Sequence, residues 1–318
     1  MAVAAVIMTA PCRMPVLASE SAEQLNVVTT IFPIYDWVRQ IIGETENASV
    51  SLLLDDGVDL HSFQPSAKDI IGIDQSDVFI YVGGESDRWV RDILQEAHNE
   101  DRIDIALTQV LKEALKEEET VEGMQEEATE ESGQEDAEYD EHVWLSLNNA
   151  ALLCEHIAKA LGEADPDNAG LYLENAASYT EELRDLDAKY RETVDHAQLK
   201  TLIFADRFPF RYLTDDYGLD YYAAFSGCSA ETEASFDTII FLADKVKELQ
   251  PGAILTIEGT DHNVARTVKD TAGGEAPGIL SLDSMQSVVG ADDSKTYLSA
   301  MEENLKVLAE ALKSDVQP

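Results

Sequence analysis

The chain has 318 residues, of which 63 are acidic and 22 are basic, and its formal net charge at pH 7 is −41. Because a surface of this charge repels phosphate backbones, we expect no nucleic-acid partner. Hydrophobic residues make up 45% of the chain, which is enough for a packed core, and the length allows two domains of ordinary size.

Residues 1–24 are predicted to be a leader segment. The apolar run from Ala2 to Ala10 is too short to cross a bilayer but fits the apolar part of a secretory signal, and a small-residue cleavage site follows at Ala18. We therefore expect an exported protein, in the periplasm or at the extracellular face of the membrane. Lipid attachment at Cys12 is the alternative, although the Thr and Pro shortly before it are poor residues for such a site.

Strands and helices are predicted to alternate through residues 25–165, which we take as an N-terminal lobe. A β-branched run begins at Leu25 and leads into an amphipathic helix that ends near Gly43. The predicted elements that follow are a strand at 49–54, a helix at 66–76, a strand at 77–84, a helix at 87–98 and a strand at 102–109.

Residues 113–141 interrupt this pattern. They are strongly acidic and contain almost no large apolar side chains, which is typical of a disordered or loop insertion. Order is expected to resume at His142 with a strand, a turn and a helix. Apolar residues then recur at a helical period through residues 168–197, which predicts one long helix of about eight turns.

We expect residues 166–197 to link the first lobe to a C-terminal lobe of residues 198–318. The predicted strands of this second lobe are at 200–206, 219–227, 253–259 and 278–285, with helices within 207–218 and at 235–250, 263–273 and 294–313. Because strands and helices alternate in both halves, the predicted fold class is α/β, with a mostly parallel sheet in each lobe.

Polar side chains occur where several of these strands end, and ligands of parallel sheets bind at that edge. The candidates are His61, His142, Asp206 with Arg207, Glu258 and Asp283. Imidazole and carboxylate groups that converge between two lobes suit zinc or manganese. A capping or structural role is the alternative for each carboxylate, and we favour it for Glu258.

Two histidine loops resemble those of a known family, the substrate-binding proteins of bacterial zinc/manganese ABC importers (the ZnuA/AdcA/TroA type, cluster A-I). "DGVDLHSFQPSAKD" around His61 is similar to that family's first ligand loop, and "YDEHVWLSL" around His142 to its second. "YGL" at 217–219 and "EASF" at 233–236 also match, and the resemblance covers about residues 25–313.

The resemblance implies two Rossmann-like lobes joined by one long helix, with the metal between them. It implies His61, His142 and Asp283 as ligands, and a third family ligand falls within "FADRFPF", where Asp206 is the best donor. This chain departs from the family there, because the neighbouring Arg207 cannot bind a cation. Cys228, Glu231 and Glu233 are the fallback donors, and a disulfide between Cys154 and Cys228 stays open.

The function implied is that of an extracytoplasmic, monomeric receptor that delivers Zn²⁺, or less readily Mn²⁺, to the permease of an ABC transporter. Ligation requires neutral imidazoles, so we expect metal affinity to fall as the pH drops through the histidine pKa. No nucleophile elbow or phosphate-binding glycine loop occurs in the sequence, and we expect no enzyme. The alternatives are the same fold adapted to another ligand, an envelope zinc hydrolase with Glu258 as base, or an adhesin.

Overall fold

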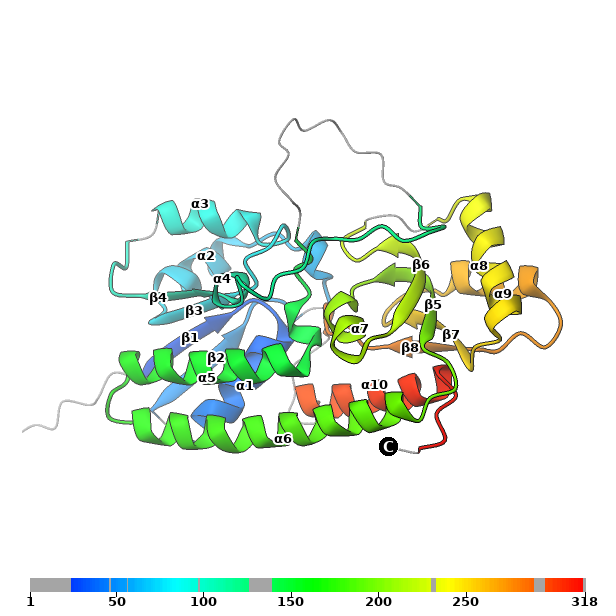
Figure 1. The fold of residues 1–318 in the computed structure, drawn as a ribbon. Helices are drawn as coiled ribbons and strands as arrows, with labels where there is room; N and C mark the ends of the chain where they lie inside the picture. The colour runs from blue at the N-terminus through cyan, green and yellow to red at the C-terminus, as the bar shows by residue number, and fades with distance from the viewer. Residues whose placement is uncertain are drawn as a thin grey trace, which may run out of the picture.

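The computed structural model describes residues 24–318 except 46, 56, 97, 126–138, 230–232, 289–294 and 317–318. The leader with Cys12, residues 126–138 of the acidic insertion and Glu231 therefore lie outside the described residues. The described part contains two four-stranded sheets, one in each half of the chain, and every strand pair is parallel (Figure 1). The predicted α/β class with two parallel-sheet lobes is confirmed.

The first sheet has the strand order β2-β1-β3-β4. Its strands are β1 (Leu25–Thr29), β2 (Ala48–Leu52), β3 (Val78–Tyr81) and β4 (Ile103–Ala106). Successive side chains of a strand point to opposite faces, so Val27 packs into one core and Val28 into another. The helices that cover these faces are α1 (Phe32–Ile42) and α5 (Leu147–Ala164) on one side and α2 (Ala67–Asp74) and α3 (Arg88–Glu96) on the other.

The second sheet repeats this arrangement with the order β6-β5-β7-β8. Its strands are β5 (Thr201–Phe208), β6 (Asp220–Ser226), β7 (Ala253–Ile257) and β8 (Gly278–Leu282). Helices α8 (Phe236–Leu249) and α9 (Asn263–Ala272) cover one face, α10 (Tyr297–Ala311) covers the other, and α7 (Arg211–Tyr217) follows β5. Strand β5 runs past the predicted end at Asp206, with a shift in its pairing to β6 between Phe204 and Arg207.

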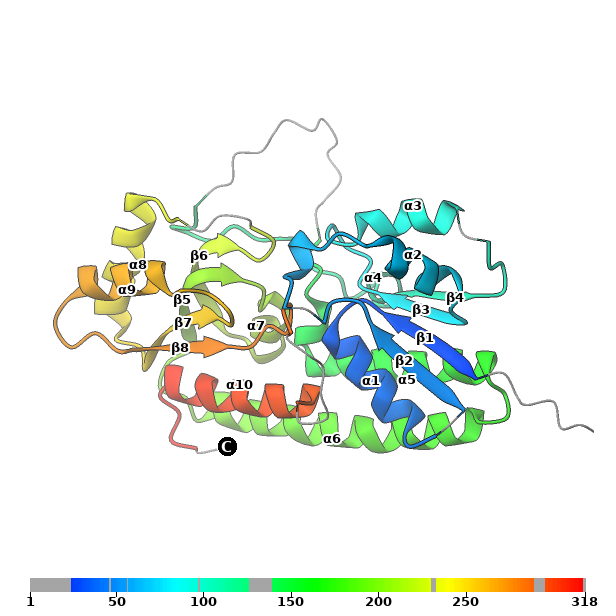
Figure 2. The same cartoon turned by 180° about the vertical axis from the view of Figure 1, so that it is seen from behind.

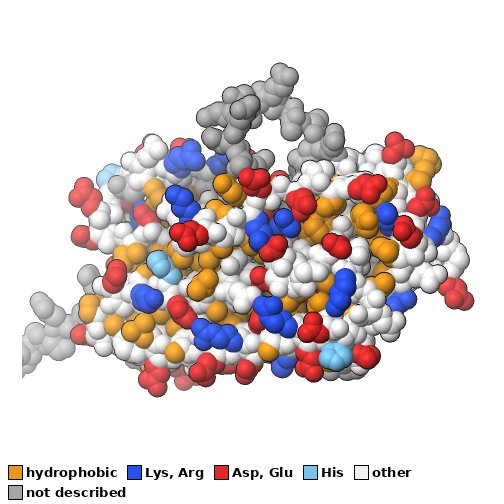
Figure 3. Space-filling model, viewed as in Figure 1, with side chains coloured by type: hydrophobic (Ala, Val, Ile, Leu, Met, Phe, Trp, Pro, Cys, Tyr) orange, Lys and Arg blue, Asp and Glu red, His pale blue; other side chains and the backbone are white. Residues whose placement is uncertain are grey.

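Helix α6 (Ala169–Asp195) runs beneath both lobes, with α10 beside it when the molecule is seen from behind (Figure 2). Its 27 residues correspond to about 40 Å at 1.5 Å per residue. Its buried side chains belong to a core that is continuous between the lobes, while acidic side chains gather along its outer edge (Figure 3). Among the described helices, none combines the length and the apolar character that crossing a membrane requires.

The described ends of the acidic insertion contact the second lobe. The amide of Lys116 donates to the hydroxyl of Tyr212 (3.2 Å), and the amide of Gln125 donates to the carbonyl of Ala224 in β6 (3.0 Å). The chain therefore crosses from the short helix α4 (Leu107–Val110) of the first lobe to the second lobe before it returns to His142 (Figure 1).

The strand predicted from His142 is wrong. The chain forms a 3-10 turn there, η2 (Val143–Leu145), between His142 and the N-cap of α5. The side chains of the turn are fully buried, and Trp144 is fixed from the second lobe. Its indole Nε1 donates to the carbonyl of Ser284 (2.9 Å), and the hydroxyl of Tyr297 donates to the carbonyl of Trp144 (2.7 Å).

The Tyr297 hydroxyl offers a test of this contact between the lobes. Tyr297→Phe leaves the buried carbonyl of Trp144 without its donor, and we expect the free energy of unfolding to fall by about 1–3 kcal/mol. Tyr35→Phe is the matched control, because the hydroxyl of the half-buried Tyr35 has no hydrogen bond to another described residue. Urea denaturation followed by circular dichroism measures both, and equal stabilities for the two variants would contradict the role of Tyr297.

Candidate metal centre

Four side chains that can bind a metal meet between the lobes. His61, Glu141, His142 and Cys228 each offer one ligand atom, and these atoms all lie within 4.8 Å of one another. His61 belongs to the 3-10 turn η1 (Leu60–Ser62) that follows β2, and Cys228 follows β6 in the second lobe. Glu141 and His142 directly precede η2. The structure therefore brings the two predicted histidines together and adds a carboxylate and a thiol.

The surroundings of His61 leave one ring nitrogen available for a cation. The hydroxyl of Ser86 hydrogen-bonds Nδ1 of His61 (2.6 Å) and also contacts the Glu141 carboxylate. Since a carboxylate only accepts hydrogen bonds, the Ser86 hydroxyl donates to Glu141 and accepts the Nδ1 proton of His61. The Nε2 atom of His61 then carries a lone pair, and it is buried without a hydrogen-bond partner among the described residues.

His142 has the same arrangement with a different partner. Its Nδ1 lies 3.0 Å from Oδ1 of Asp140, which also accepts the backbone amide of His142 (2.8 Å). The carboxylate therefore holds the proton on Nδ1, as metal-binding histidines require. Nε2 of the fully buried His142 has no hydrogen-bond partner among the residues that the structure describes. Two buried imidazole lone pairs thus face a common space.

Glu141 and Cys228 complete the cluster from opposite lobes. Glu141 is 1% exposed, its Oε2 accepts the backbone amide of Ser86 (3.1 Å), and its Oε1 lies 3.7 Å from Sγ of Cys228. Glycines allow the close approach of the loops around them. A Cβ on Gly84 would overlap the Glu141 carboxylate, and one on Gly227 would lie 2.9 Å from Cε1 of His142.

The charges of the cluster shift its pKa values in different directions. Burial and the neighbouring His142 lower the pKa of His61. Burial acts against the charged form of His142 too, but the Asp140 carboxylate outweighs it and raises that pKa. Burial and Glu141 raise the pKa of the Cys228 thiol well above its usual range. A divalent cation would bind the thiolate and both imidazole lone pairs, so its arrival releases protons.

Asp206 and Asp283, the other two predicted ligands, lie in different surroundings. Oδ2 of Asp206 accepts the hydroxyl of Thr260 (2.9 Å) and lies 3.4 Å from the amide of Ile257, which links β5 to β7. Asp283 forms an ion pair with Lys295 (2.7 Å) and accepts the amide of Met285 (2.9 Å). Neither aspartate belongs to the cluster found among the described residues.

The remaining candidates also have defined places. Glu258 accepts the amide and the hydroxyl of Ser284, both at 2.7 Å, which fits the structural role expected of it. Cys154 is buried in α5, and both it and Cys228 are free thiols. Glu233 lines a cavity of about 670 Å³ between the lobes, together with His61 and Arg207. His61 is the member of the four-residue cluster that lines this cavity.

Glu141 is the member of the cluster that sequence reasoning missed. It is the last residue of the acidic segment 113–141, where nothing distinguishes it from the many other acidic residues. Its position directly before His142 was the available signal, because adjacent residues at a tight turn can both face one site. Asp140 was hidden in the same way. Cys228 was considered only as a fallback donor.

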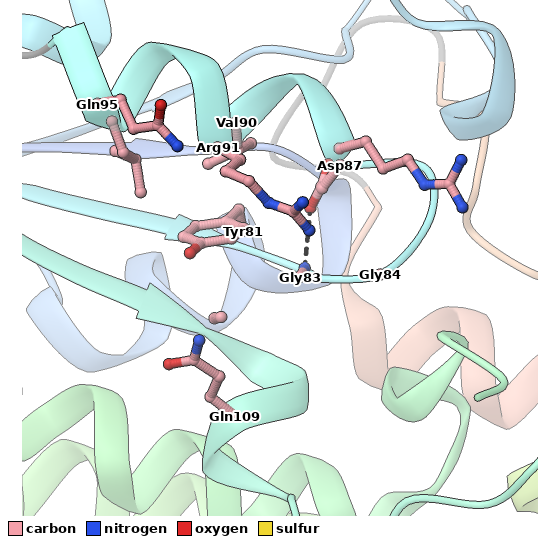
Figure 4. Close-up of a pocket in the computed structure, with 11 residues that line it drawn as sticks. Tyr81, Gly83, Gly84, Asp87, Val90, Arg91, Gln95 and Gln109 are labelled. Carbon is pink, nitrogen blue, oxygen red and sulfur yellow. Dashed lines mark hydrogen bonds between the residues drawn. The ribbon is translucent and has the colours of Figure 1, made fainter. Parts of the chain in front are cut away.

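A second cavity, of about 350 Å³, lies at the carboxyl ends of β3 and β4 (Figure 4). Tyr81, Gln109 and the buried Asp87 line it. Oδ2 of Asp87 accepts the amides of Val82 (2.6 Å) and Gly83 (3.1 Å), whereas its buried Oδ1 has no hydrogen bond to any described residue. Burial, with the nearby charge of Glu141, raises the pKa of Asp87 to about 7.

Asp87→Asn should therefore change how stability depends on pH. The pKa of Asp87 is about 7 in the folded state against an ordinary 3.8. Protonation of Asp87 stabilises the folded state. This stabilisation is fully present below the unfolded-state pKa of 3.8 and is lost as the pH rises through the folded-state pKa of about 7. Asparagine can still accept hydrogen bonds from both amides but does not ionise. When the pH is raised from 5 to 8, the free energy of unfolding of the variant should therefore rise by about 2 kcal/mol relative to that of the parent chain.

The measurement is the unfolding free energy of the zinc-free protein at both pH values. Asp92→Asn is the control, because Asp92 is exposed on α3, the helix that directly follows Asp87. If both variants follow the pH dependence of the parent chain, Asp87 is not the buried acid inferred here.

Comparison with known protein families places this geometry in context. Residues 27–311 match the family model described as the periplasmic zinc-uptake complex component A, ZnuA. The zinc-binding lipoprotein AdcA of Streptococcus pneumoniae is 32% identical over 290 residues, which cover 90% of this chain and 55% of AdcA. The high-affinity zinc uptake system protein ZnuA of Bacillus subtilis is 30% identical over 295 residues, which cover 93% of this chain and 90% of that protein.

Solved structures agree with the family match. The Zn(II)-bound ZnuA-like domain of Streptococcus pneumoniae AdcA has a TM-score of 0.71 and 30% sequence identity, and the alignment covers 92% of this chain and all of that domain. This chain spans about half the length of the AdcA proteins.

Proposed function

The chain belongs to the ZnuA family of zinc-uptake components, and we propose that it is an extracytoplasmic receptor that binds Zn²⁺ and delivers it to the permease of an ABC importer. The observation that carries this proposal is the pair of buried, unpartnered Nε2 atoms of His61 and His142, held in one cluster with a carboxylate and a thiol. Buried polar atoms without partners are costly, and a cation bound between them removes that cost.

We propose His61, Glu141, His142 and Cys228 as the zinc ligands. Two imidazoles, one carboxylate and one thiolate match the donor types and the four-coordinate geometry that zinc prefers. Manganese prefers oxygen donors, so the thiolate favours Zn²⁺ over Mn²⁺. The competing ligand set keeps the two histidines and uses Asp206 and Asp283, and an Asp206→Asn variant with undiminished zinc affinity would eliminate it.

The names of the relatives support a transport role, since AdcA is a zinc-binding lipoprotein and the Bacillus subtilis protein belongs to a zinc uptake system. We propose by analogy that this chain is exported, acts as a monomer, is held near the membrane and performs no catalysis. We also propose residues 1–24 as leader, 25–165 and 198–318 as lobes, and 166–197 as connector. Among the described residues, no geometry comparable to the four-residue cluster favours adhesion or hydrolysis.

Removing the histidines tests the site. We expect His61→Ala and His142→Ala each to weaken zinc binding more than about 100-fold, because losing even the partner of a ligand costs about 10–100-fold. Competitive calorimetry on demetallated protein measures the affinities, and His98→Ala is the control because its side chain is 91% exposed. Zinc binding by the parent chain weaker than about 10 µM, or about −7 kcal/mol, would refute the receptor function.

Cys228→Ser tests the thiolate ligand. We expect the Co²⁺-loaded parent protein to show sulfur-to-cobalt charge-transfer absorption in the near ultraviolet, and the Cys228→Ser variant to lack it. Cys154→Ala is the control, because Cys154 lies in α5 and outside the cluster. An identical spectrum for Cys228→Ser would remove Cys228 from the ligand set and leave the histidine test unaffected.

A further inference from the structure

Arg207 occupies a position where its side chain reaches across the boundary between the lobes. It lies in β5, directly after the shift in pairing between that strand and β6, and its side chain is 18% exposed. Nη2 donates to Oδ2 of Asp59 (2.8 Å), a residue 148 positions earlier in the first lobe. A guanidinium has no lone pair for a cation, so Arg207 is not a candidate ligand, and any effect on the cluster must act through the residues it contacts.

The contact with Asp59 connects Arg207 to the turn that carries His61. Asp59 is the N-cap of η1, and its Oδ1 accepts the backbone amide of His61 (3.0 Å). The two oxygens of one carboxylate therefore hold His61 on one side and Arg207 on the other. Asp59 therefore connects the Arg207 guanidinium directly to the His61 turn.

The second contact of Arg207 reaches the loop of Cys228. Nη1 lies 3.5 Å from the carbonyl oxygen of Ser229, a fully buried residue that directly follows Cys228. One planar guanidinium thus spans a ligand loop from each lobe. Its donors have fixed relative directions, so it can set a distance between two loops as a flexible ammonium cannot.

We propose that Arg207 is a positioning residue that sets the spacing between the His61 turn and the Cys228 loop, and thereby the fit of the four donors to Zn²⁺. This inference rests on the proposed function. The plain alternative is a partly exposed ion pair that joins the lobes without affecting the ligands, which contributes little to stability and nothing to zinc geometry. A further alternative is a positive charge that only repels the cation.

Four variants separate these explanations. We expect Arg207→Ala to weaken zinc binding about 10–100-fold and to reduce the visible absorption of the Co²⁺-loaded protein, because the tetrahedral geometry relaxes. Arg207→Lys should recover only part of the affinity, since one ammonium cannot hold both loops. Asp59→Asn keeps an acceptor for the His61 amide but loses the ion pair. It should weaken binding to a similar degree, and the double variant Asp59→Asn/Arg207→Ala should be little worse than either single change.

Calorimetry and the Co²⁺ spectrum give the readouts, with Arg184→Ala as the control. Arg184 forms an exposed ion pair with Glu155 on α5, away from the cluster. If the parent chain binds zinc tightly and Arg207→Ala binds it equally well or more tightly, the positioning role is refuted and the receptor function stands. If the parent chain itself fails to bind zinc, the proposed function fails, and this inference fails with it.

Discussion

The two lobes share one hydrophobic core, and the position of the candidate metal centre depends on that fact. Helix α6 contributes buried side chains along its length to a cluster that includes residues of both sheets. Trp144 is buried in this core, and the carbonyl of Ser284 and the hydroxyl of Tyr297 hold it from the second lobe. His142 lies next to that turn. His142 is thus held against the second lobe, although helix α5, which follows the turn, packs on the first lobe. Separating the lobes would therefore break buried contacts.

The fold was largely predictable from the sequence, and the reason lies in its periodicities. Strands were predicted from the β-branched runs at Leu25 and near Ala253, and helices from the helical periods of 168–197 and 235–250. Because strands and helices alternate, the topology is restricted to parallel sheets. The turn at Val143–Leu145 was not predicted, because three consecutive apolar residues are equally compatible with a strand and with a buried turn. The contacts that distinguish the two come from Ser284 and Tyr297, far along the chain.

The site was predictable in part, for a different reason. His61 and His142 stand in distinctive local motifs, so their loops could be recognised without knowing the fold. Glu141 and Cys228 carry no such motif. Glu141 precedes η2 and Cys228 follows β6, and only the folded chain brings them to the two histidines. Strand-end position proposed Asp206, but β5 continues beyond it and the carboxylate accepts hydrogen bonds from the β7 side. Sequence position can suggest a donor, whereas only the packing shows where that donor points.

The unpartnered nitrogens of the two histidines also have a consequence for how the proposed receptor would release zinc. Each Nε2 is buried and has no hydrogen-bond partner among the described residues, so if the cluster binds zinc as proposed, departure of the metal leaves two unsatisfied polar atoms. Such atoms cost about 1–3 kcal/mol each. In the proposed receptor, loss of the metal would therefore be opposed by the missing hydration of these nitrogens as well as by the metal bonds themselves, and water that reaches His61 from the cavity would lower that cost. On this proposal, a permease that admits water to that cavity would weaken zinc binding without separating the two lobes.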